Sequence, residues 1–245
     1  MSVFSLWPRM DRRVLASGLP ILIHVVDYPR PVAAAVLQVE KHFGWVVTYE
    51  DTSYVHPDDI VDITKRVRRD GDMSKRVLGM RGGTIDFTYV PQTDTVEAQV
   101  GEVMRTVVAR SQAAGNTGEF RIDSVRGGYH VVPVAIKGKS GAAEPYASLL
   151  DTRITLPAQE EDGVQMMLRL AAAITRSTKR TVTAGTMPMN ALARARVSVV
   201  ARNEIARDVL WDALQSVSPR LSWQLLCDVG ESGPCAINIH PVPKK

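Results

Sequence analysis

The spacing of apolar residues near the start of the chain predicts a strand, a helix and a second strand. Residues 21–26 form a short apolar run typical of a strand, and residues 45–50 form another that begins with a tryptophan. Between them, apolar residues recur at helical spacing over 31–42. Pro31 suits the first turn of this helix, and Gly44 can end it in a left-handed conformation.

Further elements follow an irregular stretch. Residues 84–90 alternate between apolar and polar, as in a half-buried strand. Asp94 and Glu97 have the spacing of a capping box, which predicts the start of a second helix. That helix is expected to bury Val96, Val100, Val103, Met104, Val107 and Val108. Two more strands, at 119–125 and 129–136, are joined by a tight glycine turn.

The pattern of the second half predicts the order βαββαββ. The expected elements are strand 152–156, helix 161–177, strands 181–184 and 195–201, helix 204–217, and strands 222–227 and 235–240. The first of these helices is expected to bury Val164, Met167, Leu168, Ala171 and Ile174. Asn203 is the expected N-cap of the second. We therefore predict an α+β fold in which helices pack on small mixed sheets.

Composition divides the chain into two predicted modules. Residues 138–147, GKSGAAEPYA, have the composition of a linker. They separate an N-terminal module, 21–137, from a C-terminal module, 148–245, and residues 1–20 form an extension before the first. The N-terminal module carries a basic insert at 64–83.

The overall composition is that of a soluble globular protein. Apolar residues make up 45% of the chain and charged residues 23%, whereas aromatic residues make up only 6%, which predicts an aliphatic core. A run of about 18 apolar residues is missing, so we expect no membrane span. The net charge of +4 favours an anionic partner only weakly.

The first 26 residues bear on the compartment of the protein. Arg12 and Arg13 precede the apolar run 14–26, which superficially resembles a signal peptide. Pro20 and His24 interrupt that run, so we interpret residues from 21 onwards as the first strand. A precursor with a signal sequence further upstream would give the same pattern.

The two cysteines flank a loop between two apolar runs that look like a hairpin. Cys227 and Cys235 could be small buried residues, or they could form a disulfide, which would imply an oxidising compartment. Both readings stay open. Neither cysteine belongs to a pair at metal-ligand spacing, so we expect no metal site and no cofactor.

Positive charge is concentrated in residues 65–81. Seven cations face only Asp70 and Asp72 there, and they are Lys65, Arg66, Arg68, Arg69, Lys75, Arg76 and Arg81. Such a loop could bind nucleic acid, an anionic lipid head group or an acidic protein. It contains no aromatic residues for base stacking, which weakens the case for nucleic acid. A solvated loop is the simplest interpretation.

Motifs for catalysis are weak or incomplete. Gly138-Lys139-Ser140 invites comparison with a phosphate-binding loop, but proline occupies position 133, where that motif needs glycine. The paired acids Glu50 and Asp51 mark a strand end with polar flanks, which does not suit a general acid–base pair. The five histidines are widely scattered. We therefore predict that the protein is not an enzyme.

Two distant stretches share one pattern. Residues 36–51 read VLQVEKHFGWVVTYED, and residues 214–228 read LQSVSPRLSWQLLCD. In each, a helix-like run stops, and a tryptophan then leads an apolar run that ends at an acid. Trp45 and Trp223 are accordingly predicted to be core or interface anchors of a unit that occurs twice.

Several motifs of the second half resemble a known module. VSVV at 197–200, NEIARDVL at 203–210 and LSWQLL at 221–226 resemble the short N-terminal domain shared by secretins and TonB-dependent receptors. The resemblance covers about residues 152–240, and residues 21–51 look like an elaborated copy of its first βαβ unit. It implies a periplasmic domain that binds proteins or contributes to ring assemblies and carries no catalytic residues. The long basic insert departs from the family pattern.

We therefore expect a cell-envelope interaction or assembly module with a protein partner, able to form a homo-oligomer and located in the periplasm or cell envelope. Nucleic acid is not the expected partner. Two alternatives stay open. One is a cytoplasmic adaptor that binds an anion or nucleic acid through residues 65–81, and the other is an enzyme whose site assembles only in space.

Overall fold

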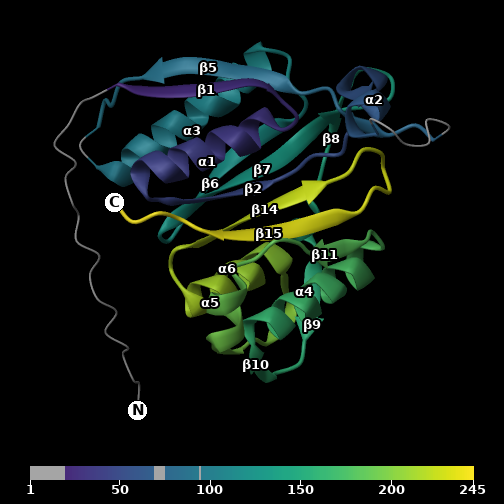
Figure 1. Cartoon of the computed structure of the whole chain (residues 1–245). Coiled ribbons are helices and arrows are strands. Elements are labelled where there is room, and N and C mark those ends of the chain that lie inside the picture. Colours follow the sequence, from purple (N-terminus) through teal and green to yellow (C-terminus); the bar gives the residue numbers. More distant parts are fainter. Residues whose placement is uncertain (1–19, 69–74, 94) are drawn as a thin grey trace.

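The computed structural model describes residues 20–68, 75–93 and 95–245. In this part of the chain six α-helices pack on small mixed sheets, which confirms the predicted α+β class (Figure 1). None of the helices described is long and apolar enough to cross a membrane.

A central mixed sheet takes strands from both halves of the chain (Figure 1). Its order is β11 (Val182–Ala184), β15 (Cys235–Pro241), β14 (Leu221–Cys227), β2 (Val46–Glu50), β7 (Gly128–Lys137) and β6 (Glu119–Val125), with β8 (Ala143–Pro145) also paired to β7. Strands β14, β2 and β7 run parallel to one another, whereas β15 is antiparallel to β14 and β6 is antiparallel to β7. The predicted linker 138–147 thus contains β8. Strands that precede it in the sequence and strands that follow it belong to the same central sheet. The division into two modules stays a prediction.

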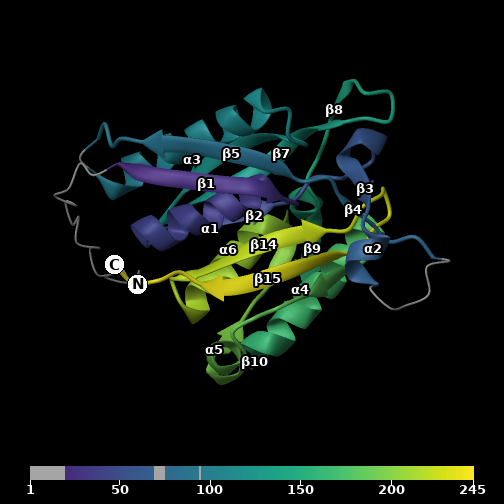
Figure 2. The ribbon, with the colours of Figure 1, turned by 45° about the horizontal axis from the view of Figure 1, so that its top comes forward.

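One face of the central sheet is covered by α1 (Pro31–Phe43) and α3 (Val96–Ala113). A two-stranded antiparallel ribbon, β1 (Ile21–Tyr28) with β5 (Gly83–Tyr89), covers the other side of these helices (Figures 1 and 2). The helices are therefore enclosed between two layers of strands. The apolar residues predicted for α3 are buried, with Val96 only partly so.

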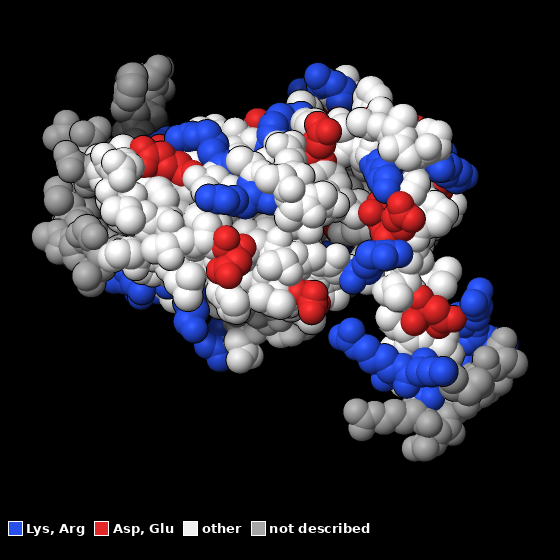
Figure 3. Space-filling view, turned by 90° about the horizontal axis from the view of Figure 1, so that it is seen from above, with Lys and Arg blue, Asp and Glu red and all other residues white. Residues whose placement is uncertain are grey.

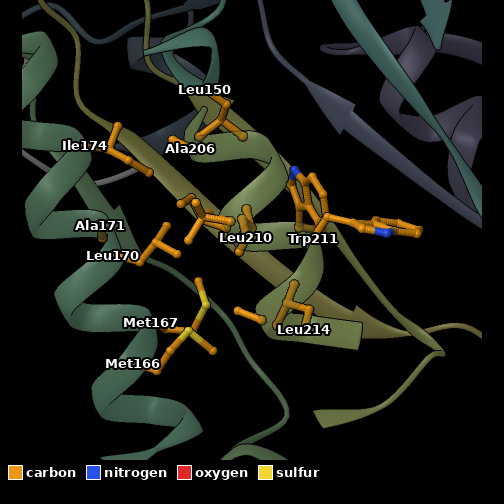
Figure 4. Packing of buried hydrophobic residues seen from close by; sticks show 14 of the residues in the cluster. Leu150, Met166, Met167, Leu170, Ala171, Ile174, Ala206, Leu210, Trp211 and Leu214 are labelled. Carbon is orange, nitrogen blue, oxygen red and sulfur yellow. The ribbon is translucent and has the colours of Figure 1, made fainter. Parts of the chain in front are cut away.

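The opposite face is covered by α4 (Gly163–Thr178) and α6 (Ala206–Val217), with the short α5 (Met189–Arg194) beside them. In Figure 4, Met167 and Leu170 of α4 face Leu210 and Leu214 of α6. Leu168, predicted to be buried, is 49% exposed. The buried stripe of α4 is centred on Leu170, and a residue two positions away lies on the far side of the helix.

Two antiparallel pairs complete this layer. Strand β9 (Arg153–Leu156) pairs with β13 (Ala201–Ile205), and β10 (Glu160–Asp162) pairs with β12 (Arg196–Ser198). The single strand predicted at 195–201 is therefore wrong, because that stretch divides between β12 and β13 and the two strands pair with different partners.

Asn203 is not the cap of α6 that the sequence predicted. It lies inside β13 with a φ of +60°, and the register against β9 shifts between Arg202 and Glu204. Asparagine tolerates the left-handed conformation, so it makes an irregularity in the strand instead of starting the helix. Helix α6 begins at Ala206, after Ile205 as N-cap.

At the start of α3 the cap is Thr95, whose hydroxyl accepts a hydrogen bond from the backbone N–H of Ala98 at 3.3 Å. Asp94, the capping residue predicted from the sequence, lies outside the described residues. Gly44 ends α1 in the left-handed conformation, with a φ of +64°, as its position predicted.

The basic insert forms a small lobe at one end of the molecule. The insert, 64–83, contains α2 (Thr64–Val67) and β4 (Leu78–Met80), and β4 pairs antiparallel with β3 (Ile60–Asp62), which precedes the insert. Ile63 packs closely against Gly79, where a Cβ would come within 2.8 Å of the Ile63 side chain. In Figure 3 this lobe projects at the lower right and is rich in Lys and Arg.

Candidate functional site

The two Trp-led stretches found in the sequence lie side by side. Strands β2 and β14 are parallel neighbours, with Tyr49 opposite Gln224. The helix before β2, α1, lies on one face of the sheet, and the helix before β14, α6, lies on the other (Figure 1). We call the carboxyl ends of β2 and β14 the switch point, because the helices that lead into the two strands lie on opposite faces; ligands of open α/β sheets commonly bind beyond the carboxyl ends of parallel strands. A ligand site of this sheet is therefore expected at this point.

Glu50, the last residue of β2, is fully buried on the α6 side. Arg207 donates from Nε and Nη2 to both carboxylate oxygens of Glu50, and the Nη2 bond is 2.8 Å long. The Ser148 hydroxyl donates to the same carboxylate, and Arg207 also donates to Asp151 at 2.8 Å. Burial raises the pKa of Glu50, and the hydrogen bonds from Arg207 oppose part of that rise.

Asp51, the next residue, is bound from the α1 side. Arg30, at the N-cap of α1, donates to Asp51 Oδ2 at 2.6 Å. The hydroxyls of Tyr49 and Tyr54 donate to Oδ1 at 2.9 and 2.7 Å, and the backbone N–H of Cys227 donates to Oδ2 at 3.1 Å. Burial, followed by the charge of Asp51, raises the pKa of both tyrosines well above the ordinary value.

His130 of β7 lies on the same face as Glu50, in an aromatic cluster. Its ring centre is 5.1 Å from that of Trp211 and 5.3 Å from that of Trp223, and its Nδ1 is 2.7 Å from the Thr48 hydroxyl. Burial, with a smaller contribution from the charge of Arg207, lowers the pKa of His130 to about 4. The ring is accordingly neutral at pH 7 and packs as part of the core.

These contacts give the switch point a structural role. The carboxylates are held by arginine, tyrosine and serine side chains, which join α1 and α6 to the end of β2. Within the described residues, no group of three or more His, Cys, Asp or Glu side chains could hold a metal ion.

The sequence marked Glu50 and Asp51 as a strand end but missed their arginine partners. Arg30 stands next to the start of a helix, which is a local signal. Nothing in the sequence connects Arg207 with Glu50, because they are 157 positions apart.

Cys227 and Cys235 form a disulfide between the facing ends of β14 and β15. Both residues are buried. The backbone carbonyl of Cys227 also accepts a hydrogen bond from Arg30, so the disulfide adjoins the Asp51 group.

The two predicted anchors are not equivalent. Trp223 is fully buried and packs against Trp211 at a ring distance of 6.0 Å. Trp45 is half-buried and packs against the core around α1 and α3.

The structure places six of the seven predicted basic residues in one lobe. None of these six lines either of two pockets found in the described part of the chain. Lys65 and Arg66 lie on α2 and are exposed, and Arg68 follows that helix. Lys75 and Arg76 precede β4, and Arg81 follows it; Arg76 pairs with Asp62 at 3.1 Å. Arg69 lies outside the described residues.

Comparisons with protein-family models, with characterised proteins and with solved structures found no match. The resemblance to the N-terminal domain of secretins and TonB-dependent receptors therefore stays a prediction.

Proposed function

We propose that this chain is a non-enzymatic protein–protein interaction module of the cell envelope, related to the short N-terminal domains of secretins and TonB-dependent receptors. The sequence resemblance over about 152–240 supports it. The disulfide between Cys227 and Cys235 also supports it, because disulfides persist in oxidising compartments such as the periplasm. So does the switch point, where the buried carboxylates bind to arginines of the chain itself.

The free edge of β5 is the observation that carries the proposal. β5 pairs with β1 in a two-stranded sheet, and none of the described strands pairs with its other edge. A protein partner can add an extended segment to such an edge, because main-chain hydrogen bonds then continue the sheet.

Gln38 of α1 shows which backbone groups of β5 face outward. Its side-chain amide accepts from the N–H of His24 at 3.1 Å and donates to the carbonyl of His24 at 2.8 Å, so these groups point away from β5. His24 lies opposite Asp86, which makes this a non-hydrogen-bonded pair of the antiparallel ladder. The backbone groups of Asp86, and by alternation those of Thr88, therefore point toward the free edge of β5.

A second contact agrees with this alternation. The carbonyl of Thr84, two positions before Asp86, accepts a hydrogen bond from the side chain of Asn116 at 3.1 Å. Asn116 thus covers the beginning of the β5 edge and leaves the stretch from Asp86 to Thr88 open.

Three other edges are less suited to a partner strand: those of β1, β6 and β11. The free edge of β1 is covered at His24 by Gln38. β6 carries Glu119, Arg121 and Asp123 in alternation, and charged residues discourage strand addition. β11 has only 3 residues.

Replacing Thr88 by proline tests this function. The substitution removes an outward N–H without removing a bond to β1, and proline is tolerated on edge strands. The matched control, Thr88→Val, keeps the N–H. We expect tagged wild-type and Thr88→Val chains to recover the same partner from a cell-envelope fraction, whereas the Thr88→Pro chain does not. Recovery of that partner by all three chains, or residence of the protein in the cytosol, contradicts the proposal.

A second candidate function is binding of an anionic ligand by the basic lobe. It is favoured by the exposure of Lys65, Arg66 and Lys75 on a projecting element (Figure 3). Binding of a labelled oligonucleotide or of anionic vesicles would weaken steeply with added salt. Charge reversal at Lys65 and Arg66 that leaves such binding unchanged contradicts this candidate.

A further inference from the structure

An open groove with a volume of about 530 Å³ runs beside the free edge of β5. One wall is formed by Thr88, Tyr89 and Val90 at the end of β5, and the other by Arg105 and Arg110 of α3. The volume lies within the range of small-ligand pockets, and the groove is open to solvent, which suits an extended chain better than an enclosed small molecule.

The charge of this groove is positive. Glu102, its acid, accepts a hydrogen bond from the Tyr89 hydroxyl at 2.6 Å. Burial, together with this bond, raises the pKa of Tyr89 to about 12, so the tyrosine stays a donor. Arg105 and Arg110 are exposed, and neither forms an ion pair with an acid in the part of the chain that the structure describes.

We propose that this groove selects an extended peptide segment of the partner protein that carries acidic side chains. The inference rests on the proposed function and names the chemistry of the segment that the β5 edge accepts. The incoming backbone bonds to Asp86 and Thr88, and every second side chain then points into the groove toward α3.

Both arginines are available to such a segment. Arg105 and Arg110 each line the groove, although five positions on a helix separate them by about 7.5 Å along the axis and about 140° around it. Alternate side chains of a strand are about 6.8 Å apart. Because both arginines line the groove, a peptide with carboxylates at alternate positions can present one carboxylate to each.

Purified full-length protein and three synthetic ten-residue peptides provide the test. The first alternates glutamate with valine and threonine, the second has lysine in place of glutamate, and the third has proline at two central positions. We expect saturable binding, by fluorescence anisotropy, of the glutamate peptide only. Hydrogen exchange at the Asp86 and Thr88 amides should slow when that peptide binds.

Variants of α3 separate the role of charge from that of the edge. We expect the double variant Arg105→Glu with Arg110→Glu to weaken binding of the glutamate peptide about tenfold or more, and to favour the lysine peptide. The matched control is Gln112→Glu, which adds an acid at an exposed position of the same helix that does not line the groove. This control should bind the glutamate peptide as the wild type does. Circular dichroism confirms that each variant is folded.

Three results would overturn the inference. Equal binding of glutamate and lysine peptides would show that the groove does not select charge, and the proposed function would stand. If no peptide binds while partner recovery still depends on Thr88, the inference about the groove is also wrong, and the proposed function again stands. Self-association of the protein that Thr88→Pro abolishes would identify a second copy of the chain as the occupant.

Discussion

Single residues decide how the interior of this protein tolerates charge. Glu50 is fully buried and Arg207 nearly so, and they neutralise each other at the end of the central strand. A buried ion pair is weak evidence for stability as such, but breaking it leaves one charge without a partner. The role of this pair is therefore to fix α6 against β2.

Replacing Arg207 alone should destabilise the fold strongly. We expect Arg207→Met to lower the free energy of unfolding by about 3 to 5 kcal/mol, because Glu50 then stays buried without a counter-charge. Urea unfolding followed by circular dichroism measures the change. The double variant Glu50→Met with Arg207→Met should recover most of the loss. A single variant as stable as the wild type would show that the pair is dispensable.

His130 should make stability depend on pH. Its pKa of about 4 in the folded chain lies below the ordinary value of 6.5, so between these values the unfolded chain binds more protons. The contribution of His130 to the free energy of unfolding should be constant above pH 6.5. It should fall by about 3 kcal/mol as the pH drops to 4. Urea midpoints measured across that range test this.

The variant His130→Asn is the control for this pH dependence. Its unfolding midpoint should vary less between pH 6.5 and pH 4 than that of the wild type. If both proteins show the same slope, other groups cause the pH dependence and the assignment to His130 is wrong.

At the scale of single elements, local sequence signals were reliable wherever one residue determined the backbone. Pro31 and Gly44 mark the two ends of α1 as predicted. Asn203 misled the prediction, because the same side chain suits a helix cap and a left-handed strand residue. The choice depended on pairing with β9, about 50 positions earlier in the chain, which no local pattern reveals.

Gly44 offers a test of the end of α1. A Cβ at this position would lie 2.9 Å from Cγ of Lys245 and 3.0 Å from the carbonyl oxygen of Pro243. We expect Gly44→Ala to lower the free energy of unfolding by about 1 to 2 kcal/mol, measured by thermal or urea unfolding. Gly115→Ala is the matched control, since Gly115 also has a positive φ, of +70°, but nothing lies within 4 Å of its Cβ position. Equal losses would show that these contacts add nothing to the cost of the left-handed conformation.

For the whole molecule, the sequence predicted most elements but not their partners. The order strand–helix–strand at 21–50 was predicted, but the pairing of β1 with β5, in a layer separated from β2 by α1 and α3, was not. An exposed sheet edge was expected as the binding surface, but the sequence could not predict which edge is free. Periodicity shows which face of an element is buried, whereas the free edge of β5 and the groove along α3 depend on how distant elements pack.

The shared sheet predicts how separated halves behave. Without β2, strand β14 would expose a long apolar edge, and Arg207 would lose Glu50. We expect residues 148–245 produced alone to aggregate, and production together with residues 20–137 to restore a soluble complex, as judged by gel filtration. A monomeric, cooperatively folded C-terminal fragment would instead support two independent modules.

The pairing of β2 with β14 also has a consequence for the timing of folding. Tyr49 lies opposite Gln224, so β2 leaves the ribosome long before the strand that completes it. At about 5 to 20 residues per second, the interval is roughly 10 to 35 s. During that time the side of β2 that pairs with β14 is open to chaperones and to other nascent chains. Because β14 is made near the end of synthesis, the pairing of β2 with β14 at the centre of the sheet forms late.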